Sequence, residues 1–155
     1  MGKWLALAAG IVVVDQIAKY AALQALSAGK PVVVTSFFNL TLVFNTGAAF
    51  SFLSDASGWQ RGFFIGIALI ASAWIVDLLR RHSRERLFSL ALALVLAGAV
   101  GNVIDRILVG AVIDFLDFHA LGYHWPAFNV ADSAITCGAV LLVWDALFPG
   151  RKAEG

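Results

Sequence analysis

Four long apolar stretches dominate the pattern of hydrophobic and polar positions along the chain. A membrane-spanning helix needs about 20 predominantly apolar residues. Four segments meet this requirement: residues 4–26, 62–79, 87–109 and 130–148. The longer connections, residues 27–61 and 110–129, carry most of the remaining polar and aromatic positions. The pattern predicts one polytopic membrane domain over residues 1–155, mainly α, with four transmembrane helices.

The positions of Lys and Arg predict the orientation of these spans, because cytoplasmic connections carry an excess of both residues. Seven basic residues fall on one side of a four-span arrangement: Lys3, Arg80, Arg81, Arg84, Arg86, Arg151 and Lys152. Three fall on the other side: Lys30, Arg61 and Arg106. We therefore expect cytoplasmic N and C termini and two long outer loops. The first apolar stretch is too long and too polar in its middle for a cleaved signal peptide.

Composition supports the membrane class and excludes other kinds of protein. The chain has 155 residues, of which 61% are hydrophobic and 14% are charged, and its mean hydropathy is +0.86. Soluble domains are typically about 25% charged. A net charge of +1 provides no basic field for nucleic acid. The single Cys137, in an apolar run, is interpreted as a buried structural residue, and the three histidines lack zinc-ligand spacing, so we expect neither a metal nor another cofactor.

The first outer loop predicts a small piece of β structure. Residues 32–35 and 40–44 are rich in β-branched and aromatic side chains, with Asn39 between them, which favours two short paired strands. Asn45 and Gly47 follow. Gly47 permits backbone conformations that other residues avoid, and Asn45 offers an amide donor and acceptor. By themselves, Asn45 and Gly47 are as typical of an ordinary turn as of a functional site.

Polar residues interrupt the first and third spans. Asp15 and Lys19 are four residues apart, so they share one helix face within the first span. They form either a self-satisfied ion pair or the support of a polar site, and the two interpretations are compatible. Asn102 and Arg106 share a face near the outer end of the third span, with Asp105 flanking it. The simplest alternative there is a helix end whose Arg extends to the lipid headgroups.

Two aspartates mark the outer ends of adjacent spans. Asp114 closes the third span and Asp132 opens the fourth, where Asn129 suits the N-cap. Alone, the first is explained as a solvated loop acid and the second as a helix-capping residue. Because a short connection joins two adjacent antiparallel helices, both carboxylates can meet at the same depth. Two carboxylates in one site do not both ionise cheaply, so one retains a proton. One can then act as base toward water and the other as acid toward a carbonyl, as in aspartic proteases. Asp117, three residues beyond Asp114, is expected in the loop and outside this pair.

Five sequence blocks in order resemble those of lipoprotein signal peptidase, also called signal peptidase II: DQIAK (15–19), NTGAAFS (45–51), GNVIDR (101–106), VIDF (112–115) and FNVAD (128–132). The resemblance implies an aspartyl endopeptidase of the bacterial inner membrane, with its active site facing the periplasm. It implies four transmembrane helices with a small extracytoplasmic β-cradle. It also implies that the enzyme cuts diacylglyceryl-modified prolipoproteins just before the lipidated cysteine.

The resemblance also implies roles for individual residues. Asp114 and Asp132 match the catalytic pair of the family. Eight further residues match positions that shape the site or bind substrate: Asp15, Lys19, Asn45, Gly47, Asn102, Arg106, Asn129 and Ala131. The expected partners are lipidated prolipoproteins, membrane lipid and inhibitors of the globomycin type, and we expect a monomer.

Two alternatives belong to other functional classes. A small proton-coupled transporter or channel subunit would use Asp15, Lys19 and Asp114 as relay groups. It would need charged groups at several depths, whereas the second and fourth spans carry none deep within them. A scaffold protein without chemistry gives no reason for so many polar groups at one height.

Overall fold

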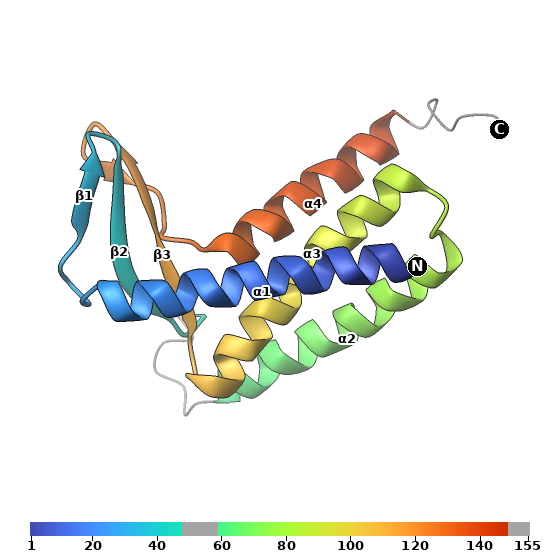
Figure 1. Cartoon of the computed structure of the whole chain (residues 1–155), viewed down its shortest axis with the longest axis horizontal. Coiled ribbons are helices and arrows are strands. Elements are labelled where there is room, and N and C mark those ends of the chain that lie inside the picture. The colour runs from blue at the N-terminus through green and yellow to red at the C-terminus, as the bar shows by residue number, and fades with distance from the viewer. Residues whose placement is uncertain (48–58, 149–155) are drawn as a thin grey trace.

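Four helices form a membrane bundle in the computed structural model, which describes residues 1–47 and 59–148 (Figure 1). They are α1 (Gly2–Ala25), α2 (Trp59–Arg81), α3 (Arg86–Leu108) and α4 (Val130–Leu147). Each is long and apolar enough to cross a membrane. The predicted four-helix membrane class is therefore confirmed, and the helices begin and end within three residues of the predicted spans.

The two ends of the bundle differ. The N-terminus, the C-terminal end of α4 and the connection between α2 and α3 lie at one end, and a β-sheet lies at the other (Figure 1). The arginine-rich stretch from Arg80 to Arg86 is therefore separated from the sheet by the length of the helices.

The sheet has four antiparallel strands in the order β1-β2-β3-β4. The strands are β1 (Val32–Thr35), β2 (Phe38–Asn45), β3 (Val112–Ala120) and β4 (Tyr123–His124). The first two confirm the predicted strand pair. The sequence pattern did not predict β3 or β4, because five of the first six residues of β3 are buried and the strand shows no alternation of polar and apolar positions.

The third helix is the centre of the bundle, and the other three helices pack against it. Its small residues allow close approach. A Cβ added at Gly98 would collide with the backbone carbonyl of Ala131 in α4, and one added at Gly101 would lie 2.7 Å from Oδ2 of Asp15 in α1. These glycines bring polar residues of three helices to one place.

The interpretation of Cys137 as a buried residue was wrong. Its side chain is exposed on α4, while Gly138 and Ala134 occupy the face of α4 that packs inward. An apolar run in a membrane helix does not distinguish lipid-facing from protein-facing positions, since both are apolar.

Candidate active site

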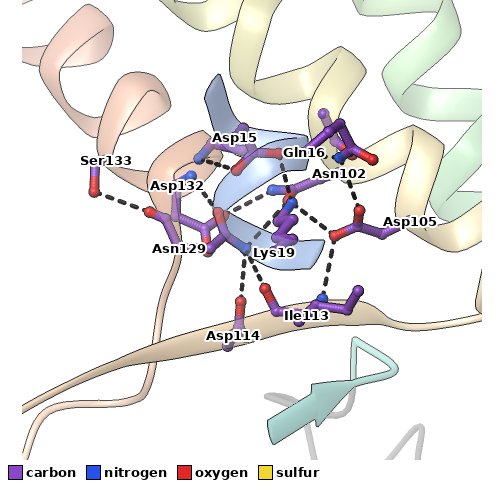
Figure 2. A network of polar contacts seen from close by, with 12 residues as sticks. Asp15, Gln16, Lys19, Asn102, Asp105, Ile113, Asp114, Asn129, Asp132 and Ser133 are labelled. Atoms are coloured by element: carbon purple, nitrogen blue, oxygen red, sulfur yellow. Dashed lines mark hydrogen bonds and ion pairs between the residues drawn. The ribbon is translucent and has the colours of Figure 1, made fainter. Parts of the chain in front are cut away.

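Asp114 and Asp132 belong to one polar network at the junction of sheet and bundle, the first on β3 and the second in the first turn of α4 (Figure 2). Asn129 connects them. Its Nδ2 donates a hydrogen bond to Oδ1 of Asp114 at 2.7 Å, and its Oδ1 accepts one from the backbone N–H of Asp132 at 2.8 Å. The second bond is the predicted N-cap. One fully buried amide therefore fixes the start of α4 against the strand that carries Asp114.

The turn after β2 supplies a second donor to Asp114. Asn45 donates from Nδ2 to Oδ2 of Asp114 at 3.1 Å, and its Oδ1 accepts the backbone N–H of Gly47 at 2.9 Å. Gly47 has φ of +93° and lies against the ring of Phe64, so a side chain there would be strained and would collide. Gly47 therefore lies in a turn, and Asn45 beside it contacts Asp114. Residues 48–51 of the same block lie outside the described residues.

A third amide holds Asp132. Asn102 donates from Nδ2 to Oδ1 of Asp132 at 2.7 Å, while its own Oδ1 accepts from Nζ of Lys19 at 3.1 Å. An ammonium group can only donate. Lys19 therefore fixes which end of the Asn102 amide faces Asp132.

The surroundings of Asp114 favour its protonated form. Burial disfavours the carboxylate, and the neighbouring charge of Asp132 disfavours it further, so the pKa of Asp114 is raised from 3.8 to about 7. Hydrogen bonds from Asn45 and Asn129 oppose this rise without cancelling it. Near neutral pH Asp114 can therefore keep a proton, as the acid of an acid–base pair requires.

A buried ion cluster lies beside the pair, between α1 and α3 (Figure 2). Nζ of Lys19 is 2.8 Å from Oδ2 of Asp15 and 2.6 Å from Oδ2 of Asp105, and none of these side chains is more than 2% exposed. Gln16 joins it by donating to Oδ1 of Asp105 at 3.0 Å. The ion pair predicted for Asp15 and Lys19 is present, and Lys19 also contacts Asn102. From the sequence, Asp105 was expected only to flank the polar face of the third span, and Gln16 was given no role, although both stand inside the sequence blocks quoted above.

Ala131, the residue before Asp132, is held by the same cluster. Its backbone N–H donates to Oδ1 of Asp15 at 2.8 Å, and its side chain is fully buried. A residue larger than alanine would meet Gly101, where α3 and α4 approach closely.

Arg106 is placed differently from a headgroup-directed side chain. Its guanidinium lies over the ring of Phe64 at 5.2 Å, Nη1 donates to the backbone carbonyl of Asn102 at 3.3 Å, and the charge of Asp132 acts on it. Its Nε is buried and has no hydrogen-bond partner among residues 1–47 and 59–148. Arg106 thus keeps donor capacity beside the aspartates.

A separate polar cluster occupies the outer half of the sheet. Asp117 lies in β3, nearly buried, and accepts hydrogen bonds from Nδ2 of Asn39 at 3.0 Å and Nδ1 of His124 at 2.8 Å. The expectation of a loop position for Asp117 was wrong for the same reason that β3 was missed. Desolvation would raise the pKa of Asp117, but the hydrogen bonds from His124 and Asn39 outweigh it and lower that pKa. In the part of the chain that the structure describes, no group of three His, Cys, Asp or Glu side chains is arranged to hold a metal ion.

Comparison with known proteins places this geometry in a family. Residues 7–148 match the family model described as Signal peptidase (SPase) II. The lipoprotein signal peptidase of Burkholderia vietnamiensis is 57% identical over 155 residues, which cover 100% of this chain and 92% of the relative. That of Cupriavidus pinatubonensis is 57% identical over 149 residues, covering 96% and 85%. A solved structure described as a bacterial membrane enzyme has a TM-score of 0.86 at 33% identity, covering 99% of this chain and 96% of the other.

The matched segment contains all five sequence blocks and every helix that contributes to the site except the first turns of α1. Family and fold therefore agree over nearly the whole chain. The chain belongs to the signal peptidase II family, whose members are proteases of the aspartic type that cleave signal peptides from prolipoproteins.

Proposed function

We propose that this chain removes signal peptides from diacylglyceryl-modified prolipoproteins by cutting just before the lipidated cysteine, with Asp114 and Asp132 as the catalytic residues. The observation that carries the assignment is the bridge through Asn129, whose amide donates to the carboxylate of Asp114 in β3 and accepts the backbone N–H of Asp132 in α4. The raised pKa of Asp114 supports it, because a dyad needs one proton at working pH.

Hydrolysis then follows as a general acid–base reaction. Asp132, as the carboxylate, takes a proton from a water whose oxygen attacks the scissile carbonyl carbon. Asp114, as the neutral acid, gives its proton to the carbonyl oxygen. When the tetrahedral gem-diol collapses, Asp114 takes back a proton from one hydroxyl as the carbonyl re-forms, the carbon–nitrogen bond breaks, and the leaving amine nitrogen takes the proton that Asp132 gained. The apparent pKa values of the rate belong to the pair rather than to either residue.

Arg106 is the side chain best suited to stabilise the developing oxyanion. Three polar side chains beside the pair are candidates for this role: Asn45, Asn102 and Arg106. The amide nitrogens of Asn45 and Asn102 already donate to Asp114 and Asp132. Arg106 is only partly buried, the charge of Asp132 acts on it, and among the described residues it donates to neither active-site carboxylate. A preorganised cation in a dry site stabilises negative charge that develops in the transition state.

The membrane sets where the substrate meets the pair. The dyad lies at the sheet end of the bundle, opposite the arginine-rich connection, so the Lys and Arg asymmetry supports an active site on the periplasmic side of the inner membrane. A signal peptide in the bilayer would present its cleavage site at this boundary while its acyl chains remain in lipid. Acyl burial then adds to the binding energy. The same site would accept globomycin-type inhibitors, and one copy of the chain holds all the residues that this chemistry uses.

Cleavage of matched precursors tests the proposal. Purified protein in detergent is incubated with one prolipoprotein in two forms, with and without the diacylglyceryl group on its cysteine, and products are separated by gel. We expect cleavage of the lipidated form only. Comparable cleavage of the unlipidated form would refute recognition of the acyl chains. Absence of cleavage of either form would refute the proposed activity.

A further inference from the structure

We propose that Lys19 is a positioning residue whose ammonium group, acting through Asp15 and Asp105, sets the separation of the two active-site aspartates. The proposal rests on the catalytic role of Asp114 and Asp132 proposed above. It explains what holds the carboxylate of Asp114, in β3, at a fixed separation from that of Asp132, in α4.

One arm of this arrangement leads to Asp132. Oδ2 of Asp15 is 2.8 Å from Nζ of Lys19, and Oδ1 of Asp15 accepts the backbone N–H of Ala131 at 2.8 Å. Ala131 is the residue directly before Asp132. The bond therefore holds the backbone of α4 at the point from which the Asp132 side chain departs.

The other arm leads to Asp114 in the same way. Oδ2 of Asp105 is 2.6 Å from Nζ of Lys19 and accepts the backbone N–H of Ile113 at 3.1 Å. Ile113 is the residue directly before Asp114. Each active-site aspartate is thus preceded by a residue whose N–H is held by a buried carboxylate, and one ammonium group joins those two carboxylates (Figure 2).

The third hydrogen of the ammonium group completes the arrangement. An ammonium group has three donors, and the third partner of Lys19 is Oδ1 of Asn102 at 3.1 Å, whose amide holds Asp132. Every donor of Lys19 is therefore directed to a group that fixes one of the aspartates or the backbone beside it. Gln16 spans the two carboxylates, donating to Asp15 at 3.2 Å and to Asp105 at 3.0 Å.

The charge of the cluster indicates a purpose other than stability. One carboxylate is enough to pair with Lys19, yet two are buried with it at positions no more than 2% exposed. Buried ionic groups cost desolvation energy that their attraction does not reliably repay, and well-packed apolar residues often serve stability better. A second buried carboxylate is explained if the backbone before Asp114 and the backbone before Asp132 must both be held in place.

The separation of the aspartates has a measurable consequence. A closely spaced pair titrates in two widely separated steps, because the first charge opposes the second. Activity that requires one proton on the pair is then a bell-shaped function of pH whose width is the difference between the two apparent pKa values. A larger or variable separation weakens the coupling and narrows the bell. A loss of folded protein lowers the whole curve without narrowing it.

The test is a charge-conserving double variant, Lys19→Met with Asp105→Asn, which removes one positive and one negative charge and breaks both arms. Wild type and variant are purified as full-length protein in detergent, and kcat, KM and the pH profile are measured on the lipidated prolipoprotein. We expect kcat to fall about 100-fold, the effect of misplacing catalytic groups by about 1 Å, with KM little changed and a narrower bell. Asp77→Asn is the matched control, since Asp77 forms the same i,i+4 ion pair with Arg81 at 2.8 Å but on the exposed surface.

Each outcome decides the question. Wild-type kcat and bell width in the double variant would overturn the proposal, and so would a uniformly lowered curve of unchanged width. If the double variant does not fold, Asp15→Asn replaces it, because that variant breaks one arm and leaves the Lys19–Asp105 pair intact; it should also narrow the bell, and an unchanged width would overturn the proposal. Full activity of Asp114→Asn would instead refute the proposed catalytic pair and is measured separately.

Discussion

Replacing Asp114 with Asn should make the stability of the protein less dependent on pH. The pKa of Asp114 in the folded protein is about 7, against 3.8 for an ordinary aspartate. The folded protein therefore binds this proton more tightly than the unfolded chain does. Its contribution to stability is fully present below pH 3.8 and is lost as the pH rises toward 7, because ionisation is then favoured in the unfolded chain.

The size of the effect follows from the two pKa values. At 1.36 kcal/mol per pKa unit, the loss between pH 5 and pH 9 is ~3 kcal/mol, and most of it falls below pH 7. For a chain of this length that corresponds to roughly 5–10 °C in the unfolding temperature. Thermal unfolding of wild type and Asp114→Asn in detergent, at intervals from pH 5 to pH 9, measures the difference while other titrating groups cancel.

The matched control is Asp117→Asn, three residues further along the same strand. The pKa of Asp117 is lowered, so its carboxylate stabilises the fold at neutral pH, and its removal should lower the unfolding temperature without removing the pH dependence. Parallel curves for wild type and Asp114→Asn across the whole range would refute the reasoning about the shared proton.

Two further predictions concern the oxyanion and the orientation. Arg106→Met should lower kcat on the lipidated substrate by about 10²- to 10³-fold with little change in KM, as removal of an oxyanion donor does; an unchanged kcat in steady-state assays would exclude this role. Ser83→Cys, in the connection between α2 and α3, should resist an impermeant thiol reagent in intact cells and react after lysis. Labelling of that cysteine in intact cells would reverse the proposed topology.

The sequence was sufficient for the features that follow from hydrophobicity and capping. Span length alone gave α1 to α4 within three residues, and the position of Asn129 before an apolar run gave the N-cap that the structure has. The pair β1 and β2 was also predictable, because its strands are rich in β-branched and aromatic residues and end at turn residues.

The features that the sequence did not predict depend on tertiary contacts. The strand β3 is buried from its first residue, so its composition resembles the end of a membrane span, and Asp117 was assigned to a loop in consequence. Asp105 was placed beside the polar face of α3, but its partner Lys19 comes from α1, 86 positions earlier in the chain. No local pattern predicts that an acid in one helix will share an ammonium group with an acid in another.

Cleavage assays of the aspartate variants test the central claim most directly. Four variants are compared on the lipidated prolipoprotein: Asp114→Asn, Asp132→Asn, the variant that combines these two substitutions, and Asp117→Asn. Unfolding temperatures are measured to show that each is folded. The side chain of Asp132 does not cap α4, because Asn129 does, so its replacement should leave the helix intact. We expect each single dyad variant to lose at least about 10²- to 10⁴-fold in kcat, the double variant to be little worse, and Asp117→Asn to keep most activity. Near-wild-type turnover in either single dyad variant, together with an inactive Asp117→Asn, would contradict the account and move the catalytic assignment to Asp117.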